Sequence, residues 1–168
     1  MAARTSLRDY QRELAARLKG AGGGRAASKL GLLAGDESWL VDLADAGEVI
    51  PVPPITPVPL TRPWFRGVAN IRGKLYSVVD FPAFLGGARV ALGEQARLLL
   101  LSERFRMSGA LLVDRSLGLR SAEQLQARAG PAGAPWLRAE YADKDGRQWN
   151  ELDVAQLVQH PDFLGVGA

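Results

Sequence analysis

The chain has 168 residues, which is enough for one well-packed domain or for two very small domains that share a core. Hydrophobic residues make up 47% of the sequence and charged residues 23%, a balance typical of soluble globular proteins. Because cysteine is absent, disulfides and thiolate metal sites are excluded. No apolar run is long enough to cross a bilayer, and the N-terminus lacks the apolar segment of a signal peptide.

The positive charge is concentrated near the N-terminus. Residues 1–30 contain seven Lys or Arg and two Asp or Glu, whereas the remainder contains fourteen and sixteen. The formal net charge of +3 therefore combines a tail of +5 with a body of −2. Proteins that bind nucleic acid more often carry a basic face on the folded body, so this distribution argues against that class.

An amphipathic helix is predicted over residues 6–19. Ser6 is a suitable N-cap, and apolar side chains follow it at helical spacing: Leu7, Tyr10, Leu14 and Leu18. A glycine-rich stretch over residues 20–24 then ends the helix and predicts a flexible linker. Such a helix either packs on the domain or binds a partner, and the spacing alone favours neither.

From residue 29 onward the pattern predicts short strands. Residues 30–43 form two apolar segments on either side of a turn signal at Gly35 and Asp36. Residues 97–114 repeat this arrangement around a turn near Glu103. Both segments therefore predict a pair of strands.

A proline-rich stretch follows the first strand pair. Residues 51–63 contain six prolines, each of which lacks the N–H that a central strand needs. The stretch could imitate a PxxP ligand, but a rigid connector inside a domain is the commoner role. We therefore predict an extended connection at the surface.

Residues 64–85 and 136–158 form an internal repeat when one residue is inserted into the first copy. The aligned residues agree in size or charge along the whole segment: Trp64 with Trp136, Arg66 with Arg138, Gly73 with Gly146, Lys74 with Arg147, Tyr76 with Trp149, Val79-Asp80 with Leu152-Asp153, and Phe84-Leu85 with Leu157-Val158. Chance does not readily produce so many matches in one register.

Each copy of the repeat predicts a β-hairpin followed by a short helix. An apolar strand begins with Trp, reaches a turn closed by Gly and returns as a second strand, because Gly tolerates the positive φ angles of tight turns. Asp80 and Asp153 end the return strands and are suitable helix N-caps. Pro82 falls in the first turn of the first helix, where its missing N–H costs little.

The predicted fold class is mostly β, with short helical turns. Two similar β-rich halves, divided at about residues 88–96, suggest two small barrels on a common core, because one such barrel alone would bury too little apolar surface. The predicted organisation is a helix and linker over residues 1–28 and one domain over residues 29–168.

Residues that could carry catalysis or hold a metal are scarce. The single histidine, His160, directly precedes Pro161 and is predicted to be a solvated surface side chain. Residues 143–146 look like part of a calcium loop, but Tyr141 and Arg147 break that pattern, so a hairpin turn is the better interpretation. We expect no metal site, no cofactor and no enzymatic activity.

The region around the first hairpin resembles the signature of CheW-like domains, the adaptors of bacterial chemosensory arrays. Residues 67–73, GVANIRG, are similar to the family's hairpin, and residues 75–85 are similar to its return strand, Asp and short helix. Residues 47–50, GEVI, and 109–114, GALLVD, resemble segments before and after it. The resemblance covers about residues 29–165.

The resemblance implies two packed SH3-like five-stranded β-barrels that serve as a non-enzymatic scaffold. The implied partners are the cytoplasmic tip of a chemoreceptor and the regulatory domain of a CheA-type histidine kinase, in the cytoplasm at membrane-associated receptor arrays. Nucleic-acid binding and membrane insertion are not expected. Carried over by position, the receptor-binding residues are Glu48, Gly67, Asn70 and Arg72.

Arg72 is interpreted differently by the two lines of reasoning. Its position in a turn, taken alone, favours a solvated arginine. The resemblance instead favours a bidentate donor to a receptor carboxylate or carbonyl.

Some features lie outside the core pattern of the family. The predicted N-terminal helix, Trp149 and the ending at residues 161–164 resemble the PilI branch, which serves twitching motility by type IV pili. Ser77 stands where the return strand commonly has proline, and Ala46 stands where valine is usual.

A small-barrel nucleic-acid-binding module is the alternative function. It would need aromatic side chains interleaved with Lys or Arg on one sheet face, and the first hairpin offers candidates: Trp64, Phe65, Arg66, Arg72, Lys74 and Tyr76. The near-neutral charge of the body argues against it.

Overall fold

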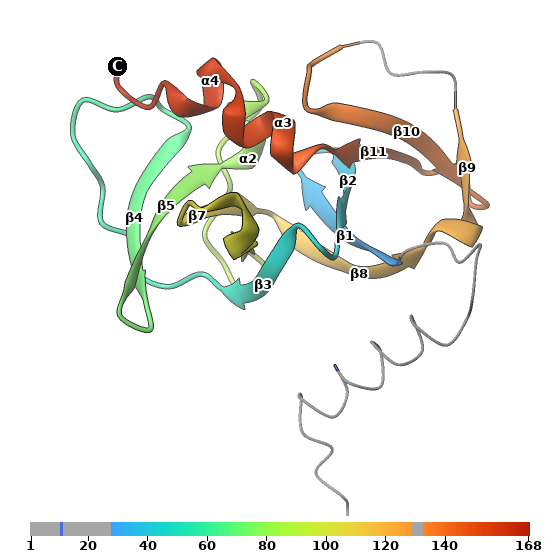
Figure 1. Cartoon of the computed structure of the whole chain (residues 1–168), viewed down its shortest axis with the longest axis horizontal. Helices are drawn as coiled ribbons and strands as arrows, with labels where there is room; N and C mark the ends of the chain where they lie inside the picture. Colours follow the sequence, from blue (N-terminus) through green and yellow to red (C-terminus); the bar gives the residue numbers. More distant parts are fainter. Residues whose placement is uncertain (1–10, 12–27, 129–132) are drawn as a thin grey trace, which may run out of the picture.

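Two curved β-sheets packed side by side make up the computed structural model of the chain (Figure 1). The structure describes residues 11, 28–128 and 133–168. The first sheet has six strands in the order β8-β1-β2-β11-β10-β9, and the second has five in the order β3-β6-β7-β5-β4. The mostly β fold class is confirmed, with one strand more in the first sheet than expected. Apart from Gln11, the predicted N-terminal helix lies outside the described residues, and the division at residue 28 stays a prediction.

The strands of the two sheets come from different parts of the chain. The first sheet contains β1 (Ser28–Ala34), β2 (Glu37–Asp42), β8 (Arg115–Ser121), β9 (Leu125–Ala127), β10 (Leu137–Asp143) and β11 (Gln148–Leu152). The second contains β3 (Ala46–Pro51), β4 (Phe65–Ile71), β5 (Lys74–Asp80), β6 (Arg97–Leu101) and β7 (Gly109–Val113). Short helices join or follow them: α2 (Phe81–Phe84), η1 (Glu103–Phe105), η2 (Ala122–Gln124), α3 (Val154–Gln159) and α4 (Pro161–Leu164).

Each sheet takes strands from both halves of the sequence. The strands β1 and β2 pair with strands from the second half, whereas β6 and β7 pair with strands from the first half. Four pairings make these connections: β2 with β11 and β5 with β7 are parallel, and β1 with β8 and β3 with β6 are antiparallel. The boundary predicted at residues 88–96 therefore separates the repeat copies, but it falls inside the second sheet, between β5 and β6.

The two repeat copies make equivalent contacts, which supports the alignment found in the sequence. The backbone N–H of Asp80 donates to the carbonyl of Trp64 at 2.7 Å, and the N–H of Asp153 donates to the carbonyl of Trp136 at the same distance. Each Asp side chain also caps the helix that follows it, as predicted.

Both hairpin turns are built as their residues predict. In the first turn Arg72 and Gly73 have φ angles of 52° and 83°, the two positive values of a tight two-residue turn. The Asn70 side chain accepts a hydrogen bond from the N–H of Gly73 at 2.9 Å. In the second turn Asp143 Oδ1 accepts two backbone N–H groups. Residues 143–146 therefore form a hairpin turn and not a calcium loop.

The central strands are buried on both faces. Leu98 and Leu100 of β6 join an apolar cluster inside the second sheet, whereas Leu99 and Leu101 join a cluster shared by the two sheets. A third cluster around Trp149 fills the inside of the first sheet. Because neither face of β6 meets water over residues 98–101, these four positions are continuously apolar.

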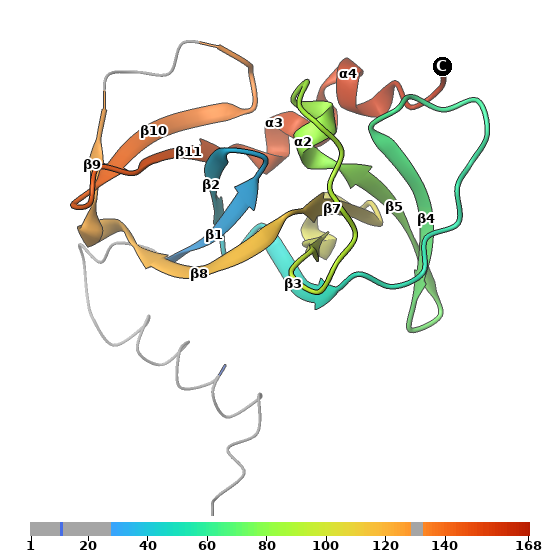
Figure 2. The same cartoon turned by 180° about the vertical axis from the view of Figure 1, so that it is seen from behind.

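The proline-rich segment 51–63 runs outside β4 (Figure 2). Thr56 exchanges two backbone hydrogen bonds with Val68 of β4, at 2.8 and 2.9 Å. Beside this crossing Gly67 has a φ of 127°, and a Cβ placed there would lie 2.0 Å from the carbonyl oxygen of Thr56. Only glycine fits at position 67, because two backbone segments cross there.

Replacing Gly67 with alanine should destabilise the fold by about 2–4 kcal/mol, because it adds both a steric clash and an unfavourable φ. Gly73→Ala is the matched control: its φ is also positive, but no atom lies within 4 Å of the added Cβ. The control should lose only about 1–2 kcal/mol. Urea unfolding followed by tryptophan fluorescence measures both losses, and equal losses would contradict the close crossing at Thr56.

Candidate protein-binding site

Glu48 and Arg72 form a bidentate ion pair on the second sheet. Glu48 lies on β3, and Arg72 lies at the tip of the β4–β5 hairpin. Arg72 Nη1 donates to Glu48 Oε1 at 3.4 Å, and Nη2 donates to Oε2. Since β3 and β4 are the two edges of this sheet, the pair ties the hairpin tip to the opposite edge.

The ion pair is open to solvent. The Arg72 side chain is 68% exposed and the Glu48 side chain 45%. The hydrogen bonds from Arg72 lower the pKa of the Glu48 carboxyl below its ordinary value. Exposed pairs contribute little to folding stability, so a partner could replace either member at a small cost.

A groove of about 430 Å³ opens beside this pair. Its walls come from β3, from the hairpin and from the end of β6, and they mix apolar and charged groups: Ala46, Gly47, Glu48, Arg72, Tyr76, Leu100, Leu101, Ser102 and Glu103. Lys74 adds a cation here, 3.7 Å from the Glu103 carboxylate and 5.4 Å above the Tyr76 ring. The groove offers the combination of apolar surface and paired charges that suits a peptide segment.

The structure brings together three of the four predicted receptor-binding residues. Glu48 and Arg72 pair directly, and Asn70 holds the turn that presents Arg72. Gly67 lies at the start of β4, under the Thr56 crossing, and its position explains the glycine without any partner.

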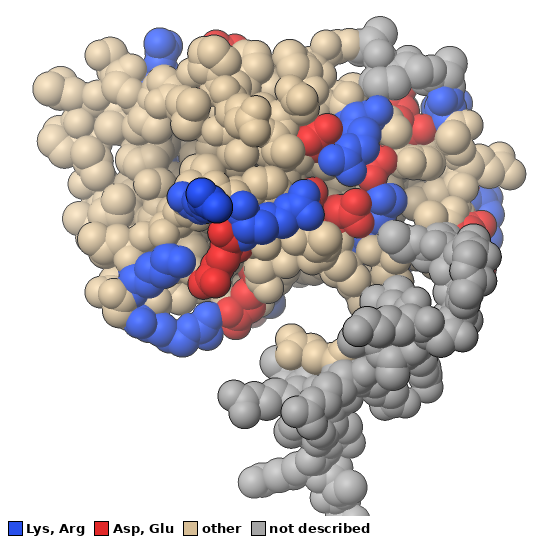
Figure 3. All heavy atoms as spheres, in the orientation of Figure 1, with Lys and Arg blue, Asp and Glu red and all other residues tan. Residues whose placement is uncertain are grey.

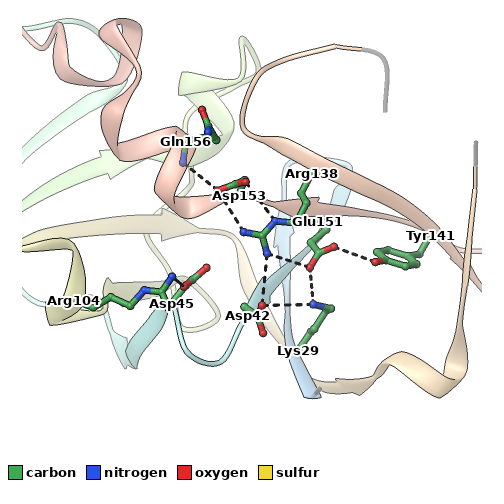
Figure 4. Close-up of polar contacts among 9 residues, drawn as sticks. All are labelled: Lys29, Asp42, Asp45, Arg104, Arg138, Tyr141, Glu151, Asp153 and Gln156. Atoms are coloured by element: carbon green, nitrogen blue, oxygen red, sulfur yellow. Dashed lines mark hydrogen bonds and ion pairs between the residues drawn. The ribbon is translucent and has the colours of Figure 1, made fainter. Parts of the chain in front are cut away.

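An ion cluster with a buried Lys29–Glu151 pair at its centre lies between the first sheet and α3 (Figure 4). Lys29 Nζ lies 2.5 Å from Glu151 Oε1, and the two side chains are only 10% and 4% exposed. Tyr141 donates its hydroxyl to the other Glu151 oxygen at 3.1 Å, and burial together with the Glu151 charge raises the pKa of Tyr141. The guanidinium of Arg138 lies within 3.7 Å of three carboxylates: Asp42, Glu151 and Asp153.

This cluster was missed at the sequence level, although the sequence carries a signal for it. Lys29 and Glu151 are charged residues next to apolar strand positions, and Arg138 aligns with Arg66 in the repeat. Lys29 and Glu151 are 122 residues apart, however, and only the parallel pairing of β2 with β11 brings them together.

A second buried carboxylate lies where the chain passes from one sheet to the other. Asp45 is 2% exposed, and Arg104 Nη2 lies 2.8 Å from its Oδ1. Burial raises the pKa of Asp45, while the Arg104 charge acts in the opposite direction. The face shown in Figure 3 carries interleaved cationic and anionic side chains.

His160 is not the solvated side chain that the sequence suggested. It is 24% exposed, its ring packs edge-on against Trp136 at 5.0 Å, and its Nδ1 accepts the N–H of Asp162 at 3.2 Å. It therefore caps α4. Within residues 28–128 and 133–168, no group of three or more His, Asp or Glu side chains is placed to hold a metal.

The aromatic residues considered for nucleic-acid binding do not form a stacking face. Phe65 is in the core, and Trp64 packs edge-on against Phe84 at 5.2 Å. Arg66 donates to the carbonyl of Val90 inside the protein. Because these three side chains are packed or hydrogen-bonded within the protein, they are not available to stack on or contact a nucleic acid.

Comparison with known families matches residues 30–162 to the CheW-like domain. The chain belongs to the CheW-like domain family. Protein PilI of Pseudomonas aeruginosa is 29% identical over 145 residues, which is 83% of this chain and 79% of PilI. The crystal structure of the scaffolding protein TtCheW from Thermoanaerobacter tengcongensis has a TM-score of 0.64 at 17% identity, covers 76% of this chain and 88% of TtCheW, and shows the same fold.

Family membership gives the chain the general role of a chemosensory adaptor, as the resemblance in the sequence implied. Among the described residues, no helix has the length and apolar character needed to span a membrane.

Removing one member of the buried Lys29–Glu151 pair should cost more than removing both. Lys29→Met leaves a buried carboxylate without its nearest cation and should lose about 3–5 kcal/mol of unfolding free energy. The double variant Lys29→Met/Glu151→Leu should recover about half of that loss or more, because no buried charge is left unpaired. A double-mutant cycle by urea unfolding measures this coupling, and strictly additive losses would contradict it.

Proposed function

We propose that this chain couples a chemoreceptor to a CheA-type histidine kinase by protein–protein contacts, without catalysing a reaction. The receptor's cytoplasmic tip would bind the groove beside Glu48 and Arg72, and the kinase's regulatory domain would bind a different surface. The observation that carries this proposal is the exposed bidentate ion pair on a hairpin tip of a CheW-like domain. Likeness to PilI supports type IV pilus twitching motility as the output of the pathway.

Exchange of ion-pair partners would give receptor binding its specificity. A receptor carboxylate or carbonyl facing Arg72 would replace Glu48 as the acceptor, and the planar guanidinium would keep two parallel hydrogen bonds. The released Glu48 carboxylate would then accept from a cation or an N–H of the receptor. Leu75, which is 61% exposed on the same hairpin, would add apolar contact.

A rigid body is what such a coupling function needs. The two sheets share one apolar cluster, so surfaces on different sheets keep a fixed separation. Fixed spacing lets two weak contacts reinforce each other, because the second binding event becomes intramolecular. Placement in the cytoplasm, at membrane-associated receptor arrays, belongs to the same proposal.

Reversing charges one at a time and then together separates a receptor contact from an internal one. Arg72→Glu and Glu48→Arg should each weaken binding to the receptor tip by about tenfold or more, because each puts like charges together and removes a charge-assisted hydrogen bond. The double variant restores an internal pair with its ends exchanged, so it should keep the wild-type stability and remain defective in binding. Isothermal calorimetry with the receptor's cytoplasmic domain measures the affinities.

Lys144→Glu is the control variant, because Lys144 is exposed in the turn of the equivalent second hairpin and should leave affinity unchanged. Recovery of binding by the double variant would contradict the proposed receptor contact, since it would show that the pair acts only within the protein.

A further inference from the structure

The first repeat copy holds a backbone segment between an Asp and an Arg. Asp80 Oδ2 accepts the N–H of Val90 at 2.9 Å, and Arg66 Nη2 donates to the carbonyl of the same residue at 3.0 Å. The Asp80 and Arg66 side chains are only 0% and 12% exposed. The pair therefore satisfies both backbone groups of one residue, as a neighbouring β-strand would.

The second copy contains the same pair, Asp153 and Arg138, in an open form. Asp153 uses Oδ1 to cap α3, as Asp80 uses Oδ1 to cap α2. In the described part of the chain, Asp153 Oδ2 accepts no backbone N–H and meets only Arg138 Nε, at 3.4 Å. Arg138 Nη2 lies 3.4 Å from Asp153 Oδ1 but donates to no carbonyl among these residues.

The Asp and Arg side chains are also more exposed in the second copy than in the first. The Arg138 side chain is 37% exposed and the Asp153 side chain 21%, so solvent reaches groups whose counterparts are covered in the first copy. The chain after Asp153 does not cover them. Phe163 follows Asp153 by ten residues, as Val90 follows Asp80, but it packs against Phe84 with ring centroids 5.6 Å apart.

The surroundings of the open pair favour a basic ligand. Two cations, Lys29 and Arg138, face three carboxylates in this cluster, which leaves an excess of one negative charge: Asp42, Glu151 and Asp153. In the first copy the residue before the held Val90 is Arg89. A basic side chain next to the bound residue would therefore meet complementary charge.

We propose that Arg138 and Asp153 bind one residue of an extended segment from a second protein, taking its N–H on Asp153 Oδ2 and its carbonyl on Arg138. The segment has a small apolar residue at the bound position and a Lys or Arg beside it, as the loop around Val90 has. This site is separate from the groove at Arg72 and does not depend on the receptor assignment. It fixes the register of the partner by two directional hydrogen bonds.

The chain's own loop supplies a probe. An acetylated and amidated peptide with the sequence of residues 87–93, GARVALG, is titrated into the ¹⁵N-labelled full-length protein and followed by NMR. We expect saturable shifts at the N–H of Gln156 and the Nε–H of Arg138, with a Kd on the order of 1 mM for so small a contact. The same peptide with an N-methylated valine cannot donate to Asp153 and should bind about fivefold more weakly or worse.

Two variants complete the test. Asp153→Asn keeps an oxygen that caps α3 but loses the charged acceptor, so it should fold normally and bind the peptide about fivefold more weakly or worse. Arg138→Lys keeps the charge but loses the planar fork, and it should weaken binding similarly.

Three results would overturn the proposal: equal affinity for both peptides, equal affinity in wild type and Asp153→Asn, or no saturable shifts up to about 10 mM peptide. So would shifts of residues 1–27 in the free Asp153→Asn protein, which would identify the N-terminal segment as the occupant.

Discussion

Parallel pairing between distant strands is the constraint on which the rest of this structure depends. In the first sheet β2 pairs with β11, and in the second β5 pairs with β7. Each pairing joins strands from different halves of the chain, so neither sheet is complete until both halves are present. Closing such long loops is entropically costly, and the shared apolar cluster between the sheets is what offsets that cost.

The exchange of strands also determines where the polar groups lie. It brings Lys29 of β1 to Glu151 of β11 and so creates a buried ion pair at the junction of the two halves. It leaves β3 and β4 as the edges of the second sheet, where the Glu48–Arg72 pair ties hairpin to edge. The two hairpins occupy equivalent positions, yet one Asp–Arg pair is closed over Val90 while the other is open.

Local features of this fold could be predicted from the sequence because short-range chemistry determines them. The hairpin at Gly73, the cap at Asp80 and the proline-rich connection are each encoded by a few adjacent residues. The repeat itself was readable because paired residues such as Trp64 and Trp136 occupy equivalent places. The partner of each strand was not readable, because a continuous apolar strand such as Leu98–Leu101 fits several neighbours equally well.

In the candidate site, too, the sequence could predict features set by adjacent residues but not those set by long-range contacts. Family resemblance predicted Glu48 and Arg72 as receptor-binding residues, and that role stays a prediction; their direct pairing depends on how the sheet curves. The polar role of Asn70 is local to its turn, and the requirement for glycine at position 67 arises from a crossing with Thr56 eleven residues earlier. The Lys29–Glu151 contact could not be predicted from the sequence, because it depends on the register between β2 and β11.

Cutting the chain in the exposed loop between Ala91 and Leu92 tests the strand exchange most directly. Fragments 1–91 and 92–168 are expressed separately and then mixed. Their folding is followed by the dispersion of amide chemical shifts in NMR spectra and by the cooperativity of urea unfolding. Each fragment alone should lack a cooperative transition, and the equimolar mixture should recover the spectrum of the intact protein. A fragment that folds cooperatively by itself would contradict the account, because it would form a sheet without strands from the other half.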